Sequence, residues 1–155
     1  MKKILFLMVA MVAMMFNANA QVKVESPNSN LNVKIINCTM SNETAVINMV
    51  LSNYGPDEEL SISNGDIEIY DNKGNYYDSK NTKITLGLTS AKKLSSSSSF
   101  TLPKDSPLKF SVSIKGVSEK TSKLTLMKLG FKSKGKLKLK KSDPVQIRNI
   151  EFSKK

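Results

Sequence analysis

The sequence predicts an all-β protein folded as an antiparallel β-sandwich of about seven to nine strands. Two observations carry this prediction. Short stretches of alternating apolar and polar residues recur along residues 31–152, and clusters of Gly, Pro, Asn, Asp and Ser separate them. Residues 21–155 contain no stretch with helical periodicity. A closed barrel is the alternative arrangement for the same pattern.

Residues 1–20 have the composition of a secretory signal peptide. Two lysines precede an apolar run over residues 4–16, and an Ala-Asn-Ala cleavage motif follows that run. The run is too short to span a hydrocarbon core about 30 Å thick, which disfavours a membrane anchor. We therefore expect an exported bacterial protein, periplasmic or extracellular, with no membrane span in the mature chain. We expect residues 21–155 to form one domain.

The clearest element is a β-hairpin predicted over residues 67–78. Strict alternation leads into a turn at residues 71–74, where Asp comes first and Gly last, as in a type I turn followed by a left-handed residue. This turn fixes the register of the hairpin. We therefore expect Ile67, Ile69 and Tyr77 to face the core.

The segments before this hairpin contain strands of different kinds. The apolar phase slips between Ile35 and Ile36, which indicates a β-bulge. Residues 44–52 are dense in apolar side chains, as in the central strand of a sheet. In chain order, we expect an edge strand or a loose lead-in within residues 21–30, a bulged strand at 31–38, the central strand at 44–52, a loop at 53–57 and a short strand at 60–62.

The segments after the hairpin continue the pattern. Five consecutive serines at residues 95–99 resemble a flexible linker, but a connection between two strands explains a loop of this length better. The apolar phase slips twice more, at Leu126 and between Ile147 and Ile150. We expect further strands at residues 82–88, from residue 100, at 109–115, at 124–131 and at 145–152.

A second hairpin is predicted around a turn at residues 132–135, because Gly135 holds the same final position as in the first turn. The same register would place Phe131 opposite Leu137, Leu129 opposite Leu139, and Lys128 opposite Lys140. Five lysines would then project from one face, namely Lys128, Lys132, Lys136, Lys138 and Lys140.

The lysine face has two interpretations. Lysines on an edge strand discourage other molecules from adding a strand to the sheet. Alternatively, the face binds an anionic polymer such as an acidic glycan, lipopolysaccharide, extracellular DNA or an acidic protein. Residues 21–90 carry a net charge of −4, whereas residues 91–155 carry +13. The basic half therefore favours an anionic partner, although no aromatic residues are interleaved with the lysines for stacking on bases.

The first hairpin contributes a second candidate surface. Its register places Tyr70 opposite Tyr76 on the outer face of the sheet. Such a pair stabilises an exposed sheet face, and it is also suited to contact a protein or a glycan. Tyr70 and Tyr76 therefore join the five lysines as candidate ligand-binding residues.

The sequence excludes several kinds of chemistry. The chain has no histidine, so a His-based triad or the common zinc sites cannot form. Cys38 has no cysteine or histidine partner, and its apolar surroundings indicate a buried small side chain. Residues 57–59 form an acidic loop, which we interpret as solvated, and Glu68 faces Asp78 in the predicted hairpin. We therefore expect no enzyme activity, catalytic residue, metal or cofactor.

The order of these features resembles a known family. The apolar strand at residues 45–51 with its Ser-Asn-Tyr-Gly loop, the Ile67 hairpin, and Leu-Pro-Lys-Asp at residues 102–105 before Phe110 are similar to the telokin-like, immunoglobulin-type extracellular domains of unknown function in bacterial secreted proteins. The resemblance spans about residues 31–131. It implies an immunoglobulin-like sandwich and a secreted interaction module whose partner is an extracellular or envelope protein or a glycan.

Overall fold

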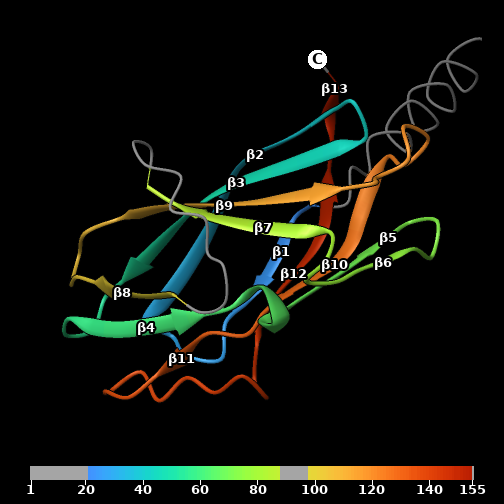
Figure 1. Ribbon diagram of the computed structural model, residues 1–155. Coiled ribbons are helices and arrows are strands. Elements are labelled where there is room, and N and C mark those ends of the chain that lie inside the picture. The colour runs from blue at the N-terminus through green and yellow to red at the C-terminus, as the bar shows by residue number, and fades with distance from the viewer. Residues whose placement is uncertain (1–20, 88–97, 155) are drawn as a thin grey trace, which may run out of the picture.

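The structure is a computed structural model that describes residues 21–87 and 98–154 (Figure 1). The predicted signal peptide at residues 1–20 and the first three serines of the run at residues 95–99 lie outside the described residues. The described part is all-β apart from one short 3-10 helix, η2 (Asn64–Asp66). The all-β prediction is therefore confirmed.

Thirteen strands form in the described residues, against the seven to nine expected. Those before the serine run are β1 (Lys23–Glu25), β2 (Leu31–Ser41), β3 (Thr44–Asn53), β4 (Glu58–Ile62), β5 (Ile67–Asp71), β6 (Tyr76–Tyr77) and β7 (Thr82–Leu86). The others are β8 (Ser98–Leu102), β9 (Leu108–Lys115), β10 (Lys123–Leu129), β11 (Lys132–Ser133), β12 (Val145–Glu151) and β13 (Ser153–Lys154). Four of the thirteen, β1, β6, β11 and β13, have only two or three residues each.

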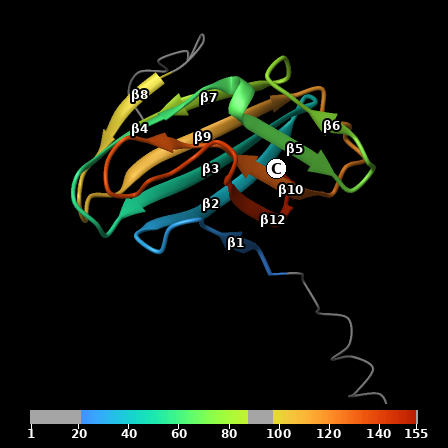
Figure 2. The same ribbon diagram turned by 90° about the horizontal axis from the view of Figure 1, so that it is seen from below.

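The strands form three sheets, which we name after a central strand. The β10 sheet has the order β1-β12-β10-β5-β6, the β3 sheet has the order β13-β2-β3-β9-β7, and the β4 sheet has the order β11-β4-β8. Neighbouring strands pair antiparallel, except that β13 pairs parallel with β2. The strand β3 is central, as predicted, and β1 is at an edge, which is one of the two alternatives for residues 21–30. Figure 2 shows the two large sheets as stacked layers of a sandwich, consistent with an immunoglobulin-like arrangement.

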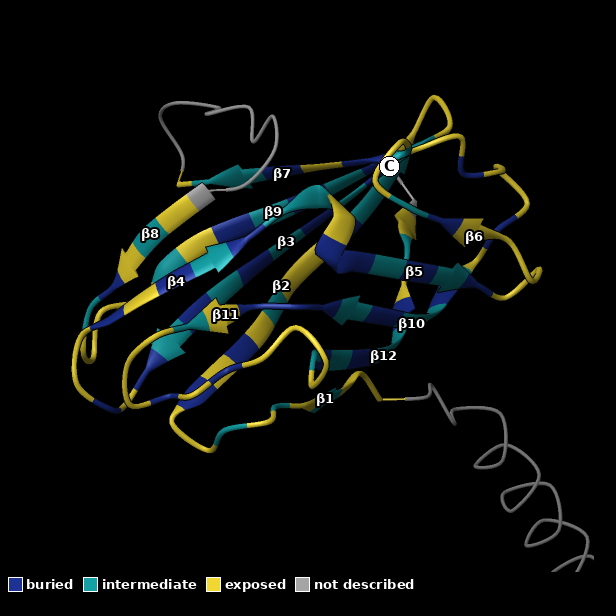
Figure 3. Ribbon diagram, turned by 60° about the horizontal axis from the view of Figure 1, so that its bottom comes forward, coloured by how far each residue is buried: buried dark blue, intermediate teal, exposed yellow. Residues whose placement is uncertain are grey.

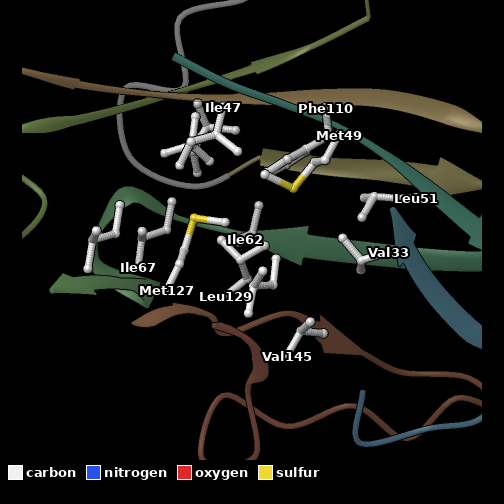
Figure 4. Close-up of a cluster of buried hydrophobic side chains, with 14 of the residues drawn as sticks. Val33, Ile47, Met49, Leu51, Ile62, Ile67, Phe110, Met127, Leu129 and Val145 are labelled. Atoms are coloured by element: carbon white, nitrogen blue, oxygen red, sulfur yellow. The ribbon is translucent and has the colours of Figure 1, made fainter. Parts of the chain in front are cut away.

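The core lies between the sheets because each contributes one apolar face. Along β3, buried and half-buried residues alternate without interruption. Figure 4 shows Ile47 and Phe110 of the β3 sheet on one side of this core, and Met127 and Val145 of the β10 sheet on the other. All four are at most 2% exposed. Their burial removes apolar surface from water, which is the main stabilising contribution in a fold without disulfides.

The predicted phase slips are β-bulges or backbone irregularities. The register between β2 and β3 shifts between Ile35 and Asn37. A second shift between Leu124 and Leu126 interrupts the pairing of β10 with β5. In β12, Asn149 has a φ of +59°, and Ile147 and Ile150 on either side of it are both buried. Each irregularity returns an apolar residue to the core.

The first hairpin has the predicted register. Ile69 pairs with Tyr77 and Tyr70 pairs with Tyr76. The turn closes through the Gly74 N–H, which donates to the Asp71 carbonyl at 3.3 Å, and Gly74 adopts a φ of +84°. That conformation favours glycine, which is the physical basis of the turn signal. Ile67, Ile69 and Tyr77 are buried, as expected.

The Asp71 carboxylate organises this turn from inside the protein. Its Oδ1 accepts the N–H groups of Lys73 at 2.8 Å and Asn75 at 2.9 Å. Its Oδ2 accepts the hydroxyls of Tyr77 at 2.9 Å and Thr121 at 3.2 Å. Burial alone would raise the pKa of Asp71, but hydrogen bonds, first those from Asn75, outweigh it and hold this pKa below its usual value. Burial and the bond to Asp71 raise the pKa of Tyr77 to about 12.

Cys38 is a buried core residue, 2% exposed, as the sequence predicts. Burial raises the pKa of its thiol to about 12, because the thiolate would lose its hydration. Cys38 therefore behaves as a small apolar side chain at neutral pH.

Candidate functional site

The structure divides the seven predicted binding residues between two surfaces. Lys128, Tyr70 and Tyr76 lie on strands of the β10 sheet. The other four, Lys132, Lys136, Lys138 and Lys140, belong to residues 132–141, which we call the lysine loop. All six lysines of this loop are exposed, including Lys134 and Lys141, which the sequence analysis did not select. Figure 3 shows exposed chain around β11, beside β4.

The predicted second hairpin is wrong. Both edges of β10 are already occupied, by β12 on one side and by β5 on the other. Lys128 therefore pairs with Glu68 and Gln146 instead of Lys140. The chain leaves the β10 sheet after Leu129, and β11 joins β4 in a different sheet.

Gly130 and Phe131 make the crossing from one sheet to the other. The Gly130 N–H donates to the Asp66 carbonyl at 2.8 Å, and a Cβ at Gly130 would lie only 3.1 Å from that oxygen. Phe131 is buried, and its ring lies edge-on to the rings of Phe110 at 5.8 Å and Phe100 at 6.5 Å between centroids. This aromatic cluster fixes the point where the lysine loop begins.

Glu58 holds the lysine loop in place. It is only 4% exposed, and its carboxylate accepts the N–H groups of Gly135 at 2.7 Å and Leu137 at 3.1 Å. The interpretation of residues 57–59 as a wholly solvated acidic loop is therefore wrong for Glu58. Gly135 does not have a positive φ, so the predicted reason for this glycine is also wrong. A Cβ there would lie 2.6 Å from Glu58 Oε2, so glycine is needed because the carboxylate approaches so closely.

Two leucines anchor the loop to the core. Leu137 and Leu139 are buried and alternate with exposed lysines. Asn28 Nδ2 donates to the Leu137 carbonyl at 3.0 Å. Leu139 closes the loop against Ser133, because the Ser133 N–H donates to its carbonyl at 3.2 Å and its own N–H donates to Ser133 Oγ at 3.0 Å. The alternation thus reflects an anchored loop rather than a strand.

A groove of about 450 Å³ lies between the lysine loop and the outer face of the β4 sheet. The strand register places Lys132 opposite Ser61, and Ser61 opposite Ser99, so these residues form one row across the sheet. The groove is lined by Lys132, Lys134, Lys140 and Lys141, by Ser61, Ser99 and Ser133, by Leu60 and Leu139, and by Glu59.

The charges around the groove are largely unbalanced. Lys141 Nζ lies 2.5 Å from Asp66 Oδ1, and Ser63 donates to Asp66 Oδ2 through its hydroxyl at 2.7 Å and its N–H at 3.1 Å. Burial alone would raise the pKa of Asp66, but hydrogen bonds from Lys141 and Ser63 hold this pKa below its usual value. The other five lysines of the loop form no ion pair within the described residues.

The second surface is the outer face of the β10 sheet. The rings of Tyr70 and Tyr76 lie 5.1 Å apart between centroids at 41°, and Tyr76 is 51% exposed. Lys128 Nζ donates to Glu68 Oε2 at 2.9 Å. This hydrogen bond raises the pKa of Lys128 and balances its charge. Lys128 therefore differs electrostatically from the lysines of the loop.

The residues that sequence reasoning missed are those that only the fold brings together. Lys134 and Lys141 are visible in the basic run, but the predicted hairpin placed Lys134 in its turn, and Lys141 lies beyond the last predicted pair, Lys128 with Lys140. Glu59 and Ser61 are about 70 residues away in sequence and join the groove only through the pairing of β4 with β11. No group of three acidic or cysteine side chains suited to a metal ion occurs in residues 21–87 or 98–154.

The fold and these surfaces define an all-β, sandwich-like protein, consistent with an immunoglobulin-like arrangement, that presents a basic groove and an aromatic sheet face. No protein-family model matches the chain, and no curated protein matches it. Within the part that the structure describes, helices long and apolar enough to cross a membrane are absent.

Proposed function

We propose that this protein is a non-enzymatic binding module that holds an anionic polymer on the lysine loop. The observation that carries the proposal is the concentration, on one short loop beside a groove, of five exposed lysines that form no ion pair with any described residue. Long-range attraction would bring an anionic chain to this surface, and ammonium groups would then contact its anionic oxygens.

The construction of the loop favours binding over edge protection alone. A loop that only blocked strand addition would not need a buried carboxylate, two buried leucines and a glycine fitted against Glu58 to hold its shape. Ordering the backbone in advance lowers the entropy cost of binding a partner.

The place of action is part of the same proposal. The signal peptide predicted at residues 1–20 and the resemblance to telokin-like extracellular domains both support a protein that works at the cell envelope or outside the cell. Acidic glycans, lipopolysaccharide and extracellular DNA are the anionic polymers found there.

Salt-dependent retention on an immobilised sulfated polysaccharide tests this function. We expect the purified protein to bind at low ionic strength and to elute with added salt, because salt screens exposed charges. The triple substitution Lys136→Gln, Lys138→Gln and Lys140→Gln should lower the salt concentration needed for elution. Equal retention of this variant would overturn the proposal.

A matched control changes the same charge elsewhere. Lys73, Lys83 and Lys109 are exposed and lie outside the lysine loop. Replacing these three with Gln should leave most of the retention intact. If both triple variants lose retention equally, binding follows net charge and the loop has no special role.

The Tyr70 and Tyr76 face supports a second candidate function, contact with a protein or a neutral glycan. Leu126 pairs with both Tyr70 and Arg148, so the two tyrosines continue into a row with an apolar and a cationic side chain. Binding to a neutral glycan array should be lost in the Tyr76→Ser variant and kept in the lysine triple variant. If the unaltered protein binds no neutral glycan, only the proposed contact with a protein remains. Binding of the Tyr76→Ser variant to envelope proteins tests that contact in the same way.

A further inference from the structure

The groove beside the lysine loop has one carboxylate among many hydrogen-bond donors. Among the described residues its lining includes four ammonium groups and three serine hydroxyls, but only one carboxylate, that of Glu59. Glu59 is exposed, and it forms no side-chain hydrogen bond or ion pair with any residue that the structure describes. Its neighbour Glu58 lies on the opposite, buried face of β4, and its carboxylate accepts hydrogen bonds from two backbone N–H groups.

The arrangement of donors suits an anion with several terminal oxygens. Lys132, Ser61 and Ser99 lie in one row across three strands. Ser133 Oγ already accepts the Leu139 N–H, so its own hydroxyl hydrogen remains available to donate. Among the described residues no arginine lines the groove, so the planar, bidentate recognition that a guanidinium gives to carboxylates and phosphates is not used here. Lysine acts as a point charge and is a common phosphate ligand.

The single carboxylate adds information about the rest of the ligand. Glu59 would repel a bare polyanion such as polyphosphate, which offers it no hydrogen to accept. A sugar hydroxyl, in contrast, donates to a carboxylate, and such charge-assisted hydrogen bonds are stronger than neutral ones. A ligand that carries both a tetrahedral anion and hydroxyl donors would satisfy the whole lining.

We propose that the groove binds a phosphorylated sugar, with the lysines and serines on the phosphate and Glu59 on a neighbouring sugar hydroxyl. This inference rests on the proposed function, because it names the chemical class of the anionic polymer. The phosphorylated sugar has two sources with the same chemistry, a phosphorylated polysaccharide and the phosphorylated sugars of lipopolysaccharide.

Amide chemical-shift titrations of the full purified protein test the proposal with glucose 6-phosphate, inorganic phosphate and glucose as probes. We expect shifts at Ser61, Ser99 and Ser133. Glucose 6-phosphate should bind about two- to tenfold more tightly than inorganic phosphate, the gain expected from one hydrogen bond to the sugar. Equal affinity of the two anions, or shifts confined to other surfaces, would overturn the proposal.

Variants of Glu59 separate its two effects. Glu59→Ala removes the repulsion and the acceptor, so it should tighten inorganic phosphate and abolish the preference for glucose 6-phosphate. Glu59→Gln keeps one acceptor oxygen and should retain part of the preference. Glu119→Ala removes an exposed acid outside the groove and should leave the preference unchanged. A preference that survives in Glu59→Ala contradicts the assignment.

Competition distinguishes the two sources. Displacement of glucose 6-phosphate by soluble phosphomannan supports a polysaccharide. Displacement by lipopolysaccharide vesicles supports a lipid-linked sugar. If neither competitor displaces glucose 6-phosphate, the proposal is overturned. The outcome is independent of the column experiment. Retention that depends on the lysine loop, combined with no preference for sugar phosphate, would leave the proposed function standing and remove only this inference.

Discussion

The Glu58 carboxylate and the Gly135 backbone are in direct contact, 2.7 Å from Oε1 to N, although 77 residues separate them in sequence. This contact ties the lysine loop to β4 and sets the shape of the groove between them. It joins a buried charge to a backbone donor, which is among the stronger hydrogen bonds in proteins.

Gly135→Ala should destabilise the protein by about 1–3 kcal/mol, because the new Cβ would meet the Glu58 carboxylate and force either the loop or Glu58 to move. Urea unfolding measures the effect. Gly65→Ala is the matched control, since the nearest atom to its Cβ would be Ser63 Oγ at 3.9 Å. Equal stability of the two variants would show that the loop is not held by this contact.

The free energy of unfolding should fall on acidification because of Asp71 and Asp66. The folded pKa of each lies below its unfolded value of about 3.9. Their stabilising contributions are therefore present above that value and are lost as the pH falls through the lower folded pKa. Urea unfolding at several pH values below 5 should show a shallower decline for Asp71→Asn than for the unaltered protein. Parallel pH profiles would contradict the role assigned to Asp71.

Cys38 should resist thiol reagents in the folded protein. Its pKa of about 12 leaves almost no thiolate at pH 8, and its side chain is 2% exposed. A colorimetric disulfide reagent at pH 8 should react with it only after denaturant is added. Rapid reaction of one thiol per chain under native conditions would show that the β2 region opens readily.

Lys128→Gln should leave retention on the anionic polysaccharide nearly unchanged, unlike substitutions in the lysine loop. Lys128 is already paired with Glu68, so its charge is balanced locally. The loss of this partly exposed pair should cost about 0.2–1 kcal/mol of stability. Comparison with Lys138→Gln on the same column checks the expectation. If the salt concentration needed for elution falls equally for Lys128→Gln and Lys138→Gln, the β10 sheet belongs to the binding surface.

Local patterns predicted most of the fold because each depends on neighbouring residues. The Gly74 turn requires a left-handed conformation, and that requirement is visible in the sequence around it. The bulge between Ile35 and Asn37 also appears directly as a slip in the apolar phase. The register of the first hairpin followed from the turn alone.

The lysine loop could not be predicted in the same way. The alternation of Lys with Leu137 and Leu139 is the same for a paired strand and for an anchored loop. The choice depends on which segment occupies the second edge of β10, and the Val145–Glu151 segment takes it. It also depends on the burial of Glu58, and nothing in the acidic run at residues 57–59 distinguishes this glutamate from its exposed neighbours. Both the pairing of β10 and the contact of Glu58 with the loop involve segments far apart in sequence, and a local pattern does not contain that information.

The parallel pairing of β13 with β2 has a consequence for how the chain reaches its native state. The strand β12 belongs to one large sheet and β13 to the other, with only Phe152 between them. Ser153 pairs with Thr39, and Arg148 pairs with Lys23, so contacts that close both sheets join residues more than a hundred positions apart. Such long-range contacts slow folding. A nascent chain therefore cannot complete the sandwich until β12 and β13 have been synthesised, long after β1 and β2.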